Sequence, residues 1–342
     1  MTSKVPFAER GGPVRGVLDL VSGCYPAFLF GGSVGDAVPV FHLHEVTREW
    51  LEPRLQFLSE NGYRTVTMDA IARYVTGGVR PAPKSIALTF DDAWESAYSV
   101  AFPLLKQYAM QAVLFAIPAR VEQPQFVTWA QLQELHASGV FDVQSHTRTH
   151  AMIFSDDEII DFVSPALEHE SILNRPLEAL ELGTPLYTRR SRMSDACRYQ
   201  ADESAADRCR AHVRKHGGRE FFKRPNWRED LTRVAGRPKG SFESDDERAS
   251  VIREELAEAR QILSERLKTN TVRHVAMPWG IAGAIARRAA EETGHELAFA
   301  ERPFRTRLVR AGDDRLGLMR LSGKFITCLP GRGRQTFFGT VR

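Results

Sequence analysis

Short apolar runs alternate with amphipathic stretches along most of the chain. The runs have the length and composition of buried strands, and they lie at residues 38–44, 65–68, 86–90, 112–117 and 140–143. In the stretches between them, apolar residues return every three or four positions, which is the spacing of one helix face. Thr47 and Thr128 precede two of these stretches as possible helix caps, and Gly62 and Gly139 follow them. This alternation predicts an α/β fold built on parallel strands.

Residues 166–243 interrupt the alternation. Positions 189–239 contain 15 Arg or Lys residues against 7 Asp or Glu residues, together with aromatic residues that can form a small core. We interpret residues 166–243 as a basic, mostly helical insertion within one domain that covers residues 1–342. The alternation then resumes with a helix that Ser244 caps and with strands at about residues 273–277, 296–300 and 316–321.

The composition excludes several classes of protein. The 342 residues are 43% hydrophobic, enough for a barrel-sized core, and a net charge of only +3 argues against a nucleic-acid partner. Residues 1–15 lack the basic-then-apolar pattern of a secretory signal, and the apolar stretch 16–32 contains Asp19 and is too short to span a bilayer. Four scattered cysteines suit a reducing compartment. We therefore expect a cytoplasmic protein.

Two short motifs carry the chemistry. One is the strand that ends in Asp91-Asp92, and the other is Ser145-His146-Thr147-Arg148-Thr149-His150, which follows a later strand. Parallel strands present their carboxyl ends together, so a carboxylate and two imidazoles can form a metal site there while the second carboxylate acts as a base. Either motif alone is ambiguous. An Asp pair often caps a helix, and His212 and His216 repeat the histidine spacing in a charged stretch that we interpret as a solvated helix face.

In this order, Leu88-Thr89-Phe90-Asp91-Asp92 and Ser145–His150 resemble the first two motifs of the polysaccharide deacetylase family, which are metal-dependent carbohydrate N- and O-deacetylases. Residues 38–44 resemble the family's entry strand, and Ala276-Met277-Pro278-Trp279-Gly280 resembles its third motif. The resemblance covers residues 37–165 and 244–325. It implies a distorted (β/α) barrel of about seven strands.

The resemblance also implies roles for individual residues. Asp92, His146 and His150 would hold a divalent metal, zinc in the first place and cobalt, nickel or manganese as alternatives. Asp91 would be the general base that activates water. Candidate substrate contacts are the aromatic residues Trp94, Trp279 and Tyr187 and the cationic residues Arg148 and Arg189.

Three departures from the family pattern shape the remaining predictions. Ala93 stands where the first motif usually has Gly, Ala276 stands where the third motif usually has an Arg that orients the base, and no histidine follows His295 to supply the late general acid. An acid is still needed to protonate the leaving amine. We predict that His44, on the N-terminal strand, provides it, with His42 second and His274 third.

The expected reaction is removal of an acyl group, in the first place N-acetyl, from an amino sugar. Without an export signal, a cytoplasmic nucleotide-linked or lipid-linked intermediate in the synthesis of O-antigen, lipopolysaccharide or capsule fits better than mature cell wall. The basic insertion could bind a diphosphate or a carboxylate, form a solvated surface, or make peripheral contact with anionic lipid. Two alternatives stay open: a catalytically silent barrel that binds a glycan or a partner enzyme, and a deformylase. The sequence leaves the oligomeric state open.

Overall fold

A computed structural model describes residues 24–169, 173, 181–302, 305 and 307–341. The described chain divides into two compact units. The barrel unit contains residues 24–149, 253–282 and 287–341, and the inserted unit contains residues 150–252 and 283–286. Among the described residues, no helix is both long and apolar enough to cross a membrane.

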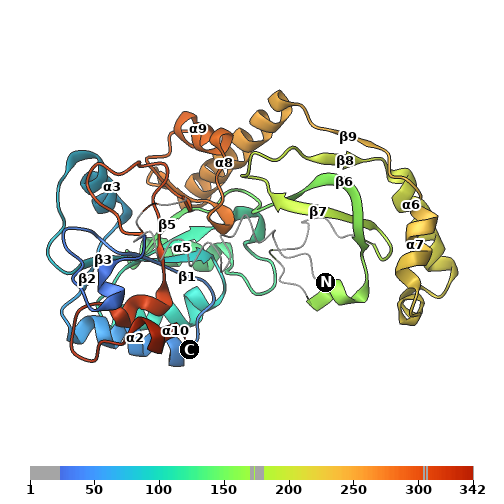
Figure 1. The fold of residues 1–342 in the computed structure, drawn as a ribbon. Coiled ribbons are helices and arrows are strands. Elements are labelled where there is room, and N and C mark those ends of the chain that lie inside the picture. The colour runs from blue at the N-terminus through green and yellow to red at the C-terminus, as the bar shows by residue number, and fades with distance from the viewer. Residues whose placement is uncertain (1–23, 170–172, 174–180, 303–304, 306, 342) are drawn as a thin grey trace. The chain divides into compact units, whose positions relative to one another are not determined.

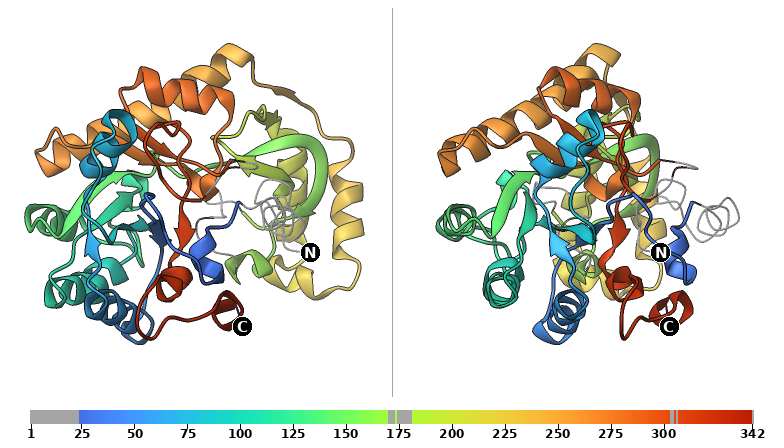
Figure 2. Two further views of the ribbon diagram at one scale, coloured as in Figure 1. Left: turned by 60° about the vertical axis from the view of Figure 1, so that its left-hand side comes forward. Right: turned by 90° about the vertical axis from the view of Figure 1, so that its left-hand side faces the viewer.

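The barrel unit is built on a parallel sheet (Figure 1). Seven strands follow one another in the order β11-β10-β5-β4-β3-β1-β12, and β2 pairs with β3 beside this path. In chain order the strands are β1 (Val40–Leu43), β2 (Arg64–Thr65), β3 (Ser85–Asp92), β4 (Ala112–Ala116), β5 (Phe141–Ser145), β10 (His274–Ala276), β11 (Leu297–Phe299) and β12 (Leu321–Ser322). The sheet curls with helices on its outer side, so the predicted fold class is confirmed (Figure 2).

The segment 315–322 links the two edges of this sheet. Leu318 forms a parallel bridge with Phe299 of β11, and three residues later Leu321 pairs with Phe41 of β1. The predicted strand 316–321 is therefore present only as a bridge at Leu318 and as the start of β12 at Leu321, and these two residues pair with different strands. Its consequence for the site is that side chains from the end of the chain reach the barrel interior.

The helices of the barrel unit begin and end largely where the sequence predicts. Thr47 caps α2 through the Trp50 N–H, and Thr128 forms a capping box with Gln131 at the start of α5. Inward-facing and outward-facing strand residues form separate apolar clusters, one containing Val40, Ala87 and Val113 and the other Phe41, Leu88 and Leu114. The helices are α2 (Arg48–Glu60), α3 (Met68–Gly77), α4 (Phe102–Gln107), α5 (Trp129–Ala137), α8 (Asp245–Leu267), α9 (Ala284–Glu292) and α10 (Phe337–Val341). The first residues of α8 and α9 are assigned to the inserted unit.

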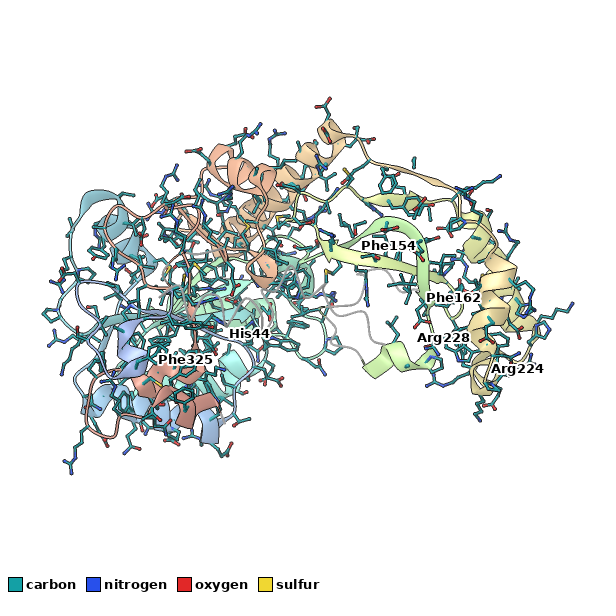
Figure 3. The ribbon with its side chains drawn as sticks, viewed as in Figure 1. His44, Phe154, Phe162, Arg224, Arg228 and Phe325 are labelled. Carbon is teal, nitrogen blue, oxygen red and sulfur yellow. The ribbon has the colours of Figure 1, made fainter. Side chains whose placement is uncertain are left out.

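The inserted unit contains strands as well as helices. It has two antiparallel pairs, β6 (Met152–Phe162) with β7 (Pro185–Ser191) and β8 (Tyr199–Ala201) with β9 (Gly240–Phe242), and the helices α6 (Glu203–Lys215) and α7 (Trp227–Ala235). Phe162, labelled in Figure 3, packs with residues of α6 and α7 in a separate apolar cluster. The unit extends beyond the predicted insertion 166–243 at both ends, because β6 and the loops around it pair within the unit.

Candidate active site

The two carboxylates of the first motif lie buried at the end of β3. All eight residues of β3 are buried, and Asp91 and Asp92 are 4% and 2% exposed. The chain leaves the strand in the left-handed region, with φ +75° at Asp92 and +63° at Ala93. This is the conformation that explains why the family favours Gly after the Asp pair. Ala93 accommodates it, held by a hydrogen bond from the Val127 N–H to its carbonyl.

His146 follows β5 directly and has a fixed orientation. Its Nδ1 lies 2.7 Å from the carbonyl oxygen of Ala276, so Nδ1 must carry a proton and donate it. Its Nε2 faces Asp92 Oδ1 at 3.3 Å. Burial disfavours the imidazolium, but the hydrogen bond with Asp92 and the charge of Asp91 outweigh it and raise the pKa of His146.

Asp92, His146 and His150 form a cluster with metal-ligand geometry. Each offers one ligand atom, these atoms lie within 4.8 Å of one another, and all three side chains are buried. His150 is joined to His146 by the short loop 147–149, so both imidazoles are positioned by the same turn of chain. A carboxylate and two imidazoles, one with its Nδ1–H held by a backbone carbonyl, are the donor set that zinc and similar ions take in open sites. The residues present therefore fit a divalent metal.

Asp91 is held by an arginine that the sequence analysis missed. Arg320, just before β12, donates Nη1–H to Oδ1 and Nη2–H to Oδ2 of Asp91, both at 2.7 Å, and a further bond to Thr89 Oγ1 at 2.9 Å. Burial alone would raise the pKa of Asp91, but the Arg320 guanidinium and then His146 hold it well below its usual range. Arg320 thus does what an Arg at the position of Ala276 would do. The available signal was a lone charge within a predicted buried strand, which needs a partner.

The three candidate acids differ sharply in environment. His44, labelled in Figure 3, is 51% exposed, and its Nε2 lies 3.8 Å from Asp91 Oδ2. Burial, followed by Arg320, lowers the pKa of His42 to about 3, so His42 is neutral at pH 7 and has no proton to give as an imidazolium. His274 is buried and contacts Asp69 at 3.2 Å. Only His44 combines access to solvent with a place beside Asp91.

Asp69, His274 and Glu296 form a second cluster with ligand atoms close together. Here Arg273 contacts both oxygens of Asp69 at 2.9 Å and Glu296 Oε1 at 2.9 Å. A single guanidinium donates to both carboxylates, so we interpret this cluster as an ion-pair network in the barrel unit, with its carboxylate oxygens already engaged.

Two of the predicted substrate contacts in the barrel unit are engaged with the site itself. Trp94 donates its indole Nε1–H to Asp92 Oδ2 at 3.0 Å and stacks on Phe126, with ring centroids 4.6 Å apart. Arg148 forms ion pairs with Glu255 and Glu258 of α8. Trp279 is partly exposed in the third-motif turn, with φ +54°. All three residues are partly exposed.

The two predicted substrate contacts in the inserted unit are buried there. Tyr187 is 2% exposed and packs between Phe154 and Tyr199, and Arg189 is 3% exposed. Neither side chain presents a surface to a ligand in this structure. The two residues are two positions apart along β7, so both lie on its covered face.

Comparisons with known proteins agree on one family. A family model described as polysaccharide deacetylase matches residues 78–181. The poly-beta-1,6-N-acetyl-D-glucosamine N-deacetylase of Escherichia coli K12 is 32% identical over 113 residues, which cover 28% of this chain and 17% of that protein. The enzyme of the same name from Staphylococcus epidermidis is 29% identical over 115 residues, covering 32% of this chain and 39% of that protein. The matched stretches thus span well under half of these relatives.

Solved structures share the fold. The BpsB deacetylase domain from Bordetella bronchiseptica has a TM-score of 0.57 at 18% identity and covers 85% of this chain and 97% of that one. IcaB from Ammonifex degensii has a TM-score of 0.52 at 20% identity, covering 84% and 92%. The family-model match, together with the two motifs at the carboxyl ends of β3 and β5, identifies residues 78–181 as a polysaccharide deacetylase domain, and the solved structures share its fold.

Proposed function

We propose that the protein is a metal-dependent deacetylase that releases acetate from N-acetylated amino sugars of a glycan. The observation that carries this proposal is the meeting, at one end of the barrel, of three candidate metal ligands with an arginine-bound carboxylate and an exposed histidine. The curated relatives are named for poly-β-1,6-N-acetyl-D-glucosamine, which supports that polymer as the first substrate to test.

Each residue has a distinct task in the proposed reaction. Asp92, His146 and His150 would hold a divalent ion, zinc in the first place, which when bound polarises the acetyl carbonyl and lowers the pKa of water. Asp91, kept ionised and oriented by Arg320, accepts a proton from the attacking water. His44 gives a proton to the nitrogen as its bond to the acetyl carbon breaks. The products are acetate and a free amine.

Acetate release from β-1,6-linked N-acetylglucosamine oligomers tests the proposal. We expect activity in the metal-loaded protein, loss with a chelator and recovery on adding zinc, cobalt, nickel or manganese one at a time. Asp91→Asn serves as the control for adventitious hydrolysis. A metal-loaded protein that releases no acetate from any N-acetylated oligosaccharide would favour the silent barrel, and release of formate from N-formyl analogues alone would favour the deformylase.

The structure bears on the choice between a polymer and a nucleotide-linked or lipid-linked sugar. Several arginines in the basic stretch of the inserted unit form ion pairs within that unit. Examples are Arg192 with Glu243, Arg210 with Glu203 and Arg228 with Asp161. Guanidinium groups engaged in this way are poor candidates for binding a diphosphate, so we place the polymer first. Turnover of a nucleotide-linked N-acetylamino sugar in preference to the oligomers would reverse that order.

The cytoplasmic location and the link to surface-glycan synthesis remain predictions. Fractionation of cells that express the tagged protein would test the location directly. Recovery in the cytoplasmic fraction would favour the nucleotide-linked or lipid-linked intermediate, whereas recovery outside the cytoplasm would favour a finished polymer.

A further inference from the structure

We propose that Glu255 of α8 is a positioning residue that holds the metal-binding loop in its ligating conformation. Its carboxylate is 3% exposed and accepts three bonds from the loop: the Thr149 N–H at 2.9 Å, the Thr149 hydroxyl at 2.8 Å and Arg148 Nη2 at 3.3 Å. Its backbone carbonyl also accepts the Arg148 N–H at 3.1 Å. The inference rests on the proposed metal site.

The loop needs such support because its backbone is strained on both sides of the residues that Glu255 holds. Thr147 has φ +64° and His150 has φ +56°, and β-branched or bulky residues avoid this region. Arg148 and Thr149 lie between them, and both donate their backbone N–H groups to Glu255. If the loop relaxed, His150 would turn away while His146, fixed by the Ala276 carbonyl, stayed in place. The distance between the two imidazoles would then no longer suit one ion.

Glu258 offers a matched comparison on the same helix. It also forms an ion pair with Arg148, at 2.5 Å, but it is 44% exposed, and among the described residues it bonds the Arg148 side chain and not the loop backbone. If the role of Glu255 were only to neutralise Arg148, the two glutamates would be equivalent. Of the two glutamates, Glu255 is the one that bonds to the Thr149 N–H and hydroxyl. We therefore expect metal affinity to depend on Glu255 and not on Glu258.

The test measures metal affinity in the full-length protein, without relying on turnover. Glu255→Gln keeps the shape of the side chain but replaces one carboxylate oxygen with an NH₂ group. Because NH₂ cannot accept a hydrogen bond, the loop loses at least one of its bonds to residue 255. We expect zinc affinity, measured by competition with a chromophoric chelator, to fall about 10–100-fold, the usual cost of losing an outer partner of a metal ligand. The visible spectrum of bound Co²⁺ should change as well. Glu258→Gln should stay within about twofold of the wild type, as expected for a weak exposed ion pair.

Several outcomes would overturn the proposal. Wild-type zinc affinity and an unchanged Co²⁺ spectrum in Glu255→Gln would reject the positioning role while leaving the metal site intact. A wild-type protein that binds no divalent metal would reject both. If Glu255→Gln fails to fold, Thr149→Val replaces it, because this variant removes the hydroxyl donor and keeps the side-chain shape. It should weaken zinc binding several-fold, and an unchanged affinity would then reject the proposal.

Discussion

Two histidine pairs in this protein have the same spacing and opposite surroundings. His146 and His150 lie in a loop at the carboxyl end of β5, are 2% and 4% exposed, and share a cluster with Asp92. His212 and His216 lie at the end of α6, with ring centroids 4.0 Å apart. His216 Nδ1 donates to the His212 carbonyl at 2.8 Å, so this ring nitrogen bonds the last turn of the helix.

The comparison shows that spacing alone does not define a metal site. A helix places residues four apart on one face whatever their purpose, whereas the loop pair depends on two left-handed residues, Thr147 and His150, and on a carboxylate from the next strand but one. What separates the pairs is the set of supports around one of them.

The largest expected effect concerns the pairs themselves. His146→Ala or His150→Ala should remove most bound metal, because two remaining ligands hold a divalent ion poorly. The double variant His212→Ala/His216→Ala should keep the wild-type metal content. Elemental analysis of the purified proteins measures both. Equal metal loss from the α6 pair would break the comparison and put a metal on the helix.

The next prediction concerns Asp91, the proposed base. Asp91→Asn should keep the metal and lose about 10²–10⁴ of turnover, since an amide cannot take a proton from water. Steady-state kinetics together with metal content provide the measurement. Loss of metal in this variant would mean that Asp91 is the ligand and Asp92 the base.

A comparable loss is expected for His44, the proposed acid. His44→Ala should bind metal normally and lose about 10²–10⁴ of turnover, and the high-pH limb of the rate profile should flatten because that limb reports an acid that must stay protonated. His42→Gln is the control. With a pKa of about 3, His42 is a neutral imidazole near neutral pH and not an imidazolium acid, so its removal should leave the high-pH limb in place. A flattened limb in His42→Gln alone would exchange the two assignments.

A smaller effect is expected for Trp94, whose indole lies beside Asp92. Trp94→Phe keeps an aromatic ring on Phe126 but removes the Nε1–H that Asp92 Oδ2 accepts. We expect zinc affinity to fall about 10-fold, within the range for outer partners of a ligand, with KM for the glycan nearly unchanged. If Trp94 were instead a sugar platform, affinity for zinc would be kept and Trp94→Ala alone would raise KM.

The last prediction concerns stability and not the candidate site, and it involves a histidine outside both pairs. Burial, followed by the charge of Arg260, lowers the pKa of His295 to about 4. Since the pKa of an unfolded histidine is about 6.5, this group contributes stability above pH 6.5 that is lost as the pH falls towards 4. The shift corresponds to about 3 kcal/mol. Urea unfolding of the metal-free protein at several pH values should show a shallower acid loss in His295→Gln, and an identical slope would contradict the prediction.

The sequence predicted the fold class and the residues of the metal cluster because both depend on local patterns. The strand β3 is an unbroken buried run ending in charge, and the histidine loop follows another strand. Arg320 was missed because its partner Asp91 is 229 positions away, and only closure of the barrel brings them together. The burial of Tyr187 and Arg189 could not be predicted, because residue type does not reveal which face of a strand is covered.

The pairing of β1 with β12 also has a consequence for how the chain folds. Phe41 pairs with Leu321, 280 positions later, so the ends of the chain must meet before the barrel is linked. Contacts so distant in sequence form late, after the entropy of a very long loop has been overcome. During synthesis, Asp92, His146 and His150 leave the ribosome well before Arg320. If Asp91 is the base, as proposed, a nascent chain that ends before Arg320 would carry the candidate metal ligands but lack the guanidinium that orients Asp91, and hydrolysis would have to await the last strand.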